Sequence, residues 1–284
     1  MKKNLKSLLT MIAFTGALFI LSSCEQETEK IELGYVLWDS EIASTHVVAA
    51  VIEDRLDHEV SLTAVDAGPM WMGVARGDFD AIVAAWLPVT HEAYLAQTQD
   101  DIINLGPNLE GARLGWVVPD YVTVNSIEEL NQYAEEFGSE IIGIDPGAGL
   151  MAASERVMED YDLDNFRLVS GSDAAMTAAL RRAIDREEWI VVTGWTPHWK
   201  FAAFDLKYLD DPKKTLGEEE HIATIVHPDL QTKAPDVYEF LDNFYWTPEE
   251  MAEVMMLIEE GMEPYDAARQ WISENQDKVD QWLE

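Results

Sequence analysis

Short apolar runs alternate with amphipathic stretches along most of the chain. Residues 31–37, 60–65 and 81–85 are rich in apolar, β-branched or alternating positions, which is typical of strands. Residues 42–54 and 70–76 lie between these runs and carry apolar side chains at helical spacing. This alternation predicts a parallel sheet with helices on its faces.

A second series of strands and helices follows. We predict further strands at 114–118, 140–144, 167–170, 189–193, 206–209 and 222–226, and helices at 150–160, 173–185, 235–244, 248–260 and 264–282. Segments 119–124 and 211–220 are predicted to cross between the two series. Two α/β lobes joined by two crossovers form a clamshell, and its interlobe cleft is the expected ligand site. The predicted lobes are 31–118 with 221–284, and 119–220.

The first 30 residues have the features of an export signal. Residues 1–23 place three lysines before an apolar stretch whose length and flanks fit a cleaved signal better than a membrane span. Small residues then precede Cys24 in the lipobox pattern of bacterial lipoproteins. We predict a signal peptide over 1–23, lipidation of Cys24 and a tether over 24–30, which place the protein outside the cytoplasm, anchored to the cell membrane. The alternative is an ordinary secretory signal with an incidental cysteine.

The charge narrows the choice of partners. The formal net charge is −35, and residues 1–23 contain three lysines and no acidic residue, so the remaining chain carries −38. This excludes nucleic acid and anionic membrane surfaces as favoured partners. The acidic surface fits either a salty environment or simple solubility, and the sequence leaves both open.

No motif for catalysis, a cofactor or a metal is present. The chain lacks the G-x-S-x-G and H-E-x-x-H patterns of common hydrolases. It also lacks the full G-x-G-x-x-G and G-x-x-x-x-G-K-[ST] patterns of nucleotide sites, and its histidine spacing gives no zinc set. We therefore expect a binding protein without a catalytic residue, metal or cofactor.

Three tryptophans share one position relative to the predicted strands. Trp38, Trp86 and Trp195 each come just after an apolar run, two in the first lobe and one in the second. A single tryptophan there would more often be a packing residue, but three that face one cleft indicate a site. The faces of indole rings attract a quaternary ammonium, which has no N–H to donate, with about 2 kcal/mol or more each where water is excluded.

Two further features suit an anionic group. The turn 146–150 lies between a strand and a helix, and its glycines and free N–H groups favour close approach of a carboxylate. His91 follows Trp86 by five residues and has a ring N–H that can donate. An ordinary turn and a surface or cap histidine are the alternative interpretations.

Six segments together are typical of one family: YVLWDSEIAST (35–45), DAGPMW (66–71), AAWLPVTH (84–91), GIDPGAGLM (143–151), GWTPHW (194–199) and YLDDPKK (208–214). With them the chain resembles the glycine betaine/proline betaine binding proteins of osmoprotectant ABC importers, over essentially the whole mature chain. The resemblance implies a type II periplasmic-binding-protein-like fold, a betaine as ligand and an ABC permease in the membrane as partner. A binding protein for choline, carnitine or another quaternary amine is the alternative.

The resemblance also implies a role for individual residues. Trp38, Trp86 and Trp195 would surround the trimethylammonium group. The backbone N–H groups of Gly149 and Leu150 would hold the carboxylate together with the His91 side chain.

Overall fold

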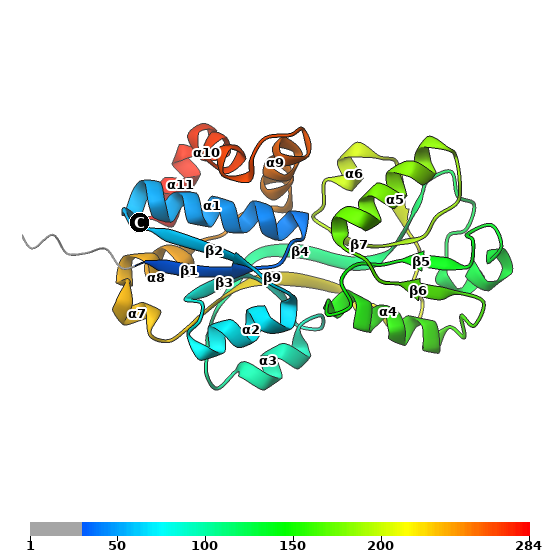
Figure 1. Ribbon diagram of the computed structural model, residues 1–284, viewed down its shortest axis with the longest axis horizontal. Coiled ribbons are helices and arrows are strands. Elements are labelled where there is room, and N and C mark those ends of the chain that lie inside the picture. Colours follow the sequence, from blue (N-terminus) through cyan, green and yellow to red (C-terminus); the bar gives the residue numbers. More distant parts are fainter. Residues whose placement is uncertain (1–29) are drawn as a thin grey trace, which may run out of the picture.

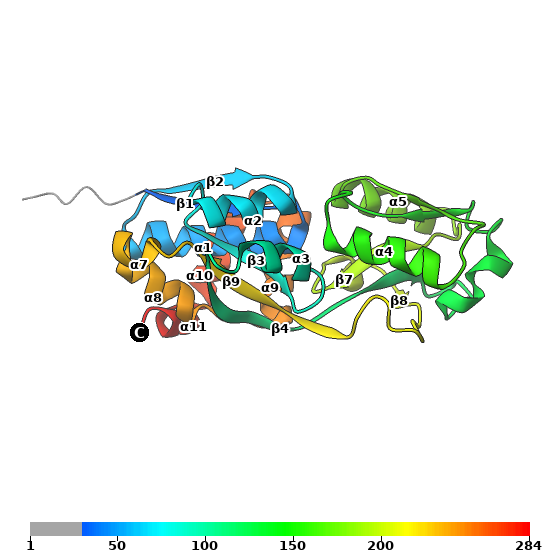
Figure 2. The same ribbon diagram turned by 90° about the horizontal axis from the view of Figure 1, so that it is seen from below.

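The computed structural model describes residues 30–284 of the chain. The predicted signal peptide, Cys24 and residues 24–29 of the tether lie outside the described residues. Within the described part, no helix is both long and apolar enough to cross a bilayer. Figures 1 and 2 show two α/β lobes side by side, connected by extended strands.

Lobe 1 combines the N-terminal elements with the C-terminal helices (Figure 1). Helices cover both faces of β3, and all seven of its residues are apolar and buried. The Thr247 hydroxyl and the Glu250 side chain form a reciprocal capping box at the start of α9. The elements of lobe 1 are β1 (Ile31–Tyr35), α1 (Asp39–Leu56), β2 (Val60–Ala64), α2 (Ala67–Arg76), β3 (Ala81–Leu87), α3 (Glu92–Thr98), α7 (Leu230–Lys233), α8 (Pro235–Asn243), α9 (Pro248–Glu259), α10 (Pro264–Glu274) and α11 (Gln276–Trp282).

Lobe 2 comes from the middle of the chain (Figure 1). Its α5 helix begins where the pattern predicts, because the Ser172 hydroxyl accepts the N–H of Ala175 and caps the first turn. The elements of lobe 2 are the 3₁₀ helix η1 (Ile127–Tyr133), β5 (Glu140–Ile142), α4 (Gly149–Asp160), β6 (Arg167–Val169), α5 (Asp173–Asp185), β7 (Val192–Thr196), α6 (Lys200–Ala203) and β8 (Leu206–Tyr208).

Two strands, β4 (Ile103–Pro119) and β9 (Glu219–Val226), join the lobes into one sheet of order β2-β1-β3-β9-β4-β7-β5-β6, with β8 beside β4. β1 is parallel to β2 and β3, and β5 is parallel to β6 and β7. β4 and β9 are antiparallel to their neighbours. The sheet is therefore mixed, and the prediction of a parallel sheet holds only within each lobe.

The first crossing between the lobes lies inside β4. This strand pairs with β9 up to Arg113 and with β7 from Arg113 onward. Register shifts interrupt its pairing with β9, and Gly106 and Gly111 have positive φ, so the strand can bend between the lobes. The crossing predicted at 119–124 therefore lies earlier in the chain. The residue boundaries predicted for the lobes stay a proposal.

Two further predictions need correction. β7 begins at Val192 rather than at Trp189, so Trp195 lies within the strand instead of beyond it. Trp86 likewise lies within β3, at its second-last position. The helix predicted over 264–282 is two helices, because the backbone leaves helical geometry at Asn275.

Candidate functional site

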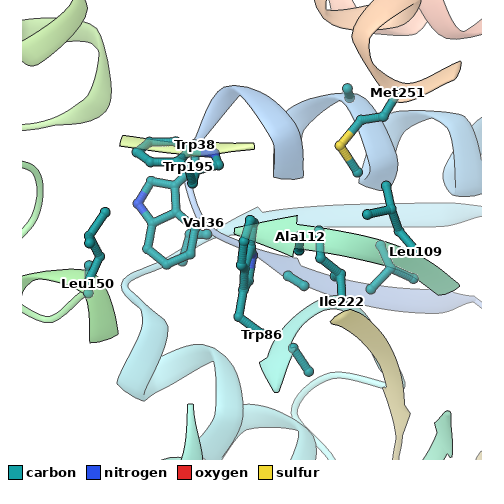
Figure 3. Close-up of a cluster of buried hydrophobic side chains, with 14 of the residues drawn as sticks. Val36, Trp38, Trp86, Leu109, Ala112, Leu150, Trp195, Ile222 and Met251 are labelled. Carbon is teal, nitrogen blue, oxygen red and sulfur yellow. The ribbon is translucent and has the colours of Figure 1, made fainter. Parts of the chain in front are cut away.

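Trp38, Trp86 and Trp195 come together between the lobes, and we call this group the cage (Figure 3). Trp38 is the residue that precedes α1, Trp86 is the second-last residue of β3, and Trp195 belongs to β7 of lobe 2. The rings of Trp38 and Trp195 lie 6.3 Å apart at an interplanar angle of 55°. The three rings and five other residues line one cavity: Thr90, Leu114, Ile144, Ala148 and Leu150.

This cavity is small, at about 20 Å³, which is close to the space that one water molecule needs. The cage side chains thus lie close together in this structure. A larger hollow of about 760 Å³ lies beside β4 and β8 and shares Leu114 with the cage cavity. The guanidinium of Arg113 lies 4.3 Å from the ring centroid of Tyr208 there, so this aromatic face already contacts a cation.

Each cage indole donates its N–H to a polar partner away from the cavity. Trp38 Nε1 donates to Asp145 Oδ2 at 3.1 Å, and Trp195 Nε1 donates to Ser40 Oγ at 3.2 Å. Both bonds join the two lobes. Trp86 Nε1 donates to Glu41 Oε1 at 2.8 Å, within lobe 1. The ring edges are thus held by the protein, which leaves ring faces to line the cavity.

Glu41 is fully buried beside the cage. Burial raises its pKa to about 7, although the N–H of Trp86 acts in the opposite direction. The site therefore contains a carboxyl group that titrates near neutral pH without lining the cavity. Neither Glu41 nor the cross-lobe acceptors Asp145 and Ser40 were predicted, since nothing in their spacing separates them from surface polar residues.

His91 is buried and presents one defined tautomer. Its Nδ1 accepts the backbone N–H of Trp86 at 3.1 Å and the Nε1–H of Trp71 at 3.3 Å, so the proton resides on Nε2. Among the described residues, Nε2 finds no hydrogen-bond partner although it is buried. Burial lowers the pKa of His91 to about 3, which keeps the ring neutral. The ring lies 6.1 Å from that of Trp38, so an unpaired donor stands beside the cage.

The N-terminus of α4 approaches Thr90, the residue before His91, from the other lobe. Gly149 and Leu150 open the helix, where N–H groups have no intrahelical acceptor. A Cβ on Gly149 would lie 2.2 Å from the carbonyl oxygen of Thr90, so a glycine is required for this approach. Thr90 itself is fixed because its N–H donates to Glu220 Oε1 at 2.8 Å. The six residues predicted for the site therefore lie on the two sides of one interlobe cleft.

A polar cluster surrounds the loop after Trp195. Ligand atoms of Asp39, Asp173 and His198 lie within 4.8 Å of one another, a grouping able to hold a cation that histidine spacing did not indicate. These groups already bond within the protein: Asp173 accepts the Asp39 N–H at 3.0 Å and contacts His198 Nε2 at 3.2 Å. The neighbouring Lys200 is buried with its Nζ 4.2 Å from the Trp195 ring centroid, and burial lowers its pKa to about 7.

Two α/β lobes, a pair of connecting strands and a site that draws residues from both lobes define a two-lobed solute-binding protein. Residues 29–274 match the family described as the substrate binding domain of ABC-type glycine betaine transport systems. The chain belongs to this family, a family of transport proteins rather than enzymes, and the predicted fold class is confirmed.

Individual relatives agree with this assignment. The chain is 49% identical over 152 residues to the glycine betaine/carnitine transport binding protein GbuC of Listeria monocytogenes, an alignment that covers 53% of this chain and 51% of that protein. The match thus spans about half the length of that relative.

Solved structures match over more of the chain. Lactococcal OpuAC in its closed form with glycine betaine is 45% identical, with a TM-score of 0.86, covering 90% of this chain and 100% of the other. ProX of Borrelia burgdorferi is 33% identical, with a TM-score of 0.86, covering 90% and 97%. A choline-binding protein in complex with choline is 24% identical, with a TM-score of 0.83 over 89% and 91%, and shows the shared fold.

Proposed function

We propose that this protein captures glycine betaine, or a closely related betaine, in the interlobe cleft and delivers it to the permease of an ABC importer. The ligand's trimethylammonium group would lie against Trp38, Trp86 and Trp195. Its carboxylate would accept hydrogen bonds from His91 and from the N–H groups of Gly149 and Leu150. The ligand leaves chemically unchanged, which its recovery from the complex would test.

One observation carries the choice of a betaine over a simple amine: the neutral, buried His91 holds an unpaired Nε2–H beside the aromatic rings. A buried donor without an acceptor costs free energy. In a betaine one carbon separates the carboxylate from the quaternary nitrogen, so the carboxylate would supply that acceptor while the cation contacts the indoles. Choline has no carboxylate and would leave the donor unpaired.

The experiment is calorimetric titration of the wild type and His91→Ala with glycine betaine, proline betaine, carnitine and choline. We expect the wild type to bind a betaine best. His91→Ala should weaken betaine binding about tenfold, the effect of losing a hydrogen bond to a charged group, and change choline binding little. Thermal unfolding of each variant shows that it is folded. Preference of the wild type for choline would contradict the proposed ligand.

We also propose that the chain acts outside the cytoplasm, held to the membrane by lipid on Cys24. The lipobox pattern around Cys24 supports this proposal, and two acyl chains suffice for stable anchoring. Expression of the whole chain with Cys24→Ala should move the protein from the membrane fraction to the soluble extracytoplasmic fraction. Retention of this variant on the membrane would contradict the anchor.

A further inference from the structure

The cage tryptophans differ in where their indole N–H groups find partners. Trp86 donates to Glu41 of its own lobe, whereas Trp38 and Trp195 donate across the cleft to Asp145 and Ser40. The two cross-lobe bonds run in opposite directions, since one donor comes from each lobe. A bond of this kind can form only when the lobes are closed.

We infer that Asp145 and Ser40 are positioning residues that couple closure of the lobes to assembly of the cage. Each accepts the indole N–H of a tryptophan on the opposite lobe and so orients that ring toward the cavity. The faces of the same two rings would contact the ligand, while their N–H edges hold the lobes together. We call the two cross-lobe hydrogen bonds, Trp38 to Asp145 and Trp195 to Ser40, the latch. The inference rests on the proposed function for its ligand, but the latch itself is a property of the protein.

Neither acceptor lines the cage cavity, and each holds the edge of its indole ring rather than the face. Ser40 is fully buried in the first turn of α1, whose N-terminal end points toward lobe 2 (Figure 1). Asp145 is only partly buried and lies in the turn before α4. Its charge therefore stays partly hydrated in the closed state, so the bond from Trp38 forms without full desolvation of the carboxylate.

A further contact strengthens the same junction. The backbone N–H of Asp39, between Trp38 and Ser40, donates to Asp173 Oδ2 of lobe 2 at 3.0 Å. Three consecutive residues at the start of α1 thus bond to lobe 2 through an indole, a backbone amide and a hydroxyl. Opening the lobes breaks all three bonds together, which would make the closed state a discrete one.

The test compares Asp145→Ala, Asp145→Asn and Ser40→Ala with Asp164→Ala, which removes the same charge at an exposed position of lobe 2. Dissociation of isotope-labelled glycine betaine is followed after a chase with unlabelled ligand. We expect Asp145→Ala to release ligand about tenfold faster, in line with loss of a charge-assisted hydrogen bond. Asp145→Asn keeps an oxygen acceptor and should recover part of the loss, and Asp164→Ala should match the wild type.

A double-mutant cycle separates positioning from general stability. Trp38→Phe keeps an aromatic face but has no N–H, so adding Asp145→Ala to it should have little further effect. An equal effect of Asp145→Ala in both backgrounds, or wild-type release by Asp145→Ala, would overturn the inference.

A second measurement does not need the ligand. Dyes placed on the two lobes report the closed fraction of ligand-free molecules by single-molecule energy transfer. The latch predicts a lower closed fraction in Asp145→Ala than in Asp164→Ala, and equal fractions would count against it. A wild type that binds no betaine but shows this difference would refute the ligand and support the latch. If the wild type binds betaine but Asp145→Ala does not change the closed fraction, the ligand is supported and the latch is refuted.

Discussion

Two groups of three tryptophans occupy different parts of the molecule, and only one is built as a site. Trp246, Trp271 and Trp282 pack in lobe 1, with Trp271 lying 5.8 Å from Trp246 and stacked on Trp282 at 5.9 Å and 16°. Trp271 and Trp282 cover each other's faces, and Trp246 meets Trp271 edge to face. The cage rings of Trp38 and Trp195 are tilted by 55° around a cavity.

The partners of the ring edges differ in the same way. In the C-terminal group, Trp271 donates to Glu253 and Trp282 to the Tyr245 carbonyl, both in lobe 1. In the cage, two of the three N–H groups bond across the cleft. Abundant tryptophan is therefore not itself a sign of binding, whereas ring faces turned to a cavity between two lobes are such a sign.

The largest expected effect belongs to the packing group. Trp271→Ala should lower the free energy of unfolding by about 3–5 kcal/mol, because a fully buried indole leaves a cavity. Chemical denaturation measures this loss. The betaine affinity of the molecules that remain folded should stay within about twofold of the wild type, since the residue lies away from the cleft. A large loss of betaine affinity in Trp271→Ala would contradict the separation of a packing group from a binding group.

The next effect concerns two glutamates that accept an indole N–H, one in each group. The pKa of Glu41 is raised to about 7 from an ordinary 4.5, so protonation stabilises the folded state. This stabilisation is complete below about pH 4.5 and is lost as the pH rises through about 7, at a cost of about 3 kcal/mol. Glu41→Gln stays neutral and keeps an oxygen for Trp86, so it should gain stability over the wild type as the pH rises through this window.

Denaturation between pH 4.5 and 8 measures the gain, with Glu253→Gln as the matched control at an exposed position. If the difference in stability between Glu41→Gln and the wild type does not change with pH, the carboxyl group is not titrating in this window.

A smaller free-energy change is expected for replacement of a cage residue, and it concerns ligand binding. Trp195→Ala should weaken betaine binding at least tenfold, because one indole face contributes about 2 kcal/mol. Calorimetric titration measures the change. Trp271→Ala serves as the comparison, because it should lower the free energy of unfolding while leaving the betaine affinity nearly unchanged. Wild-type affinity in Trp195→Ala would contradict the cage.

The sequence predicts the elements within each lobe better than the connections between the lobes. The spacing places α5 at its observed bounds, and it marks the three cage tryptophans because each lies at the end of an apolar run. Only residues 114–118 of the long β4 strand were predicted, since the glycines at 106 and 111 and the register shifts break the alternation of apolar positions in its first part. A strand whose pairing partners change along its length has no single periodicity of apolar positions from which it could be predicted.

Partners across the cleft could not be predicted for a different reason. Trp38 and Asp145 are 107 positions apart, and Trp195 and Ser40 are 155 apart. Their contact depends on how two lobes close, which local propensity does not encode. His91 was placed by its motif, but its tautomer follows from two donors, one of them on another helix.

The central claim is that aromatic faces from both lobes select a cation without N–H groups. The most direct test is calorimetric titration of the wild type with glycine and its mono-, di- and trimethylated derivatives, which share one carboxylate and differ only in methylation of the nitrogen. The account predicts that affinity rises with each methyl group and is greatest for the trimethylated compound. Equal affinities across the series, or tightest binding of glycine, would contradict it.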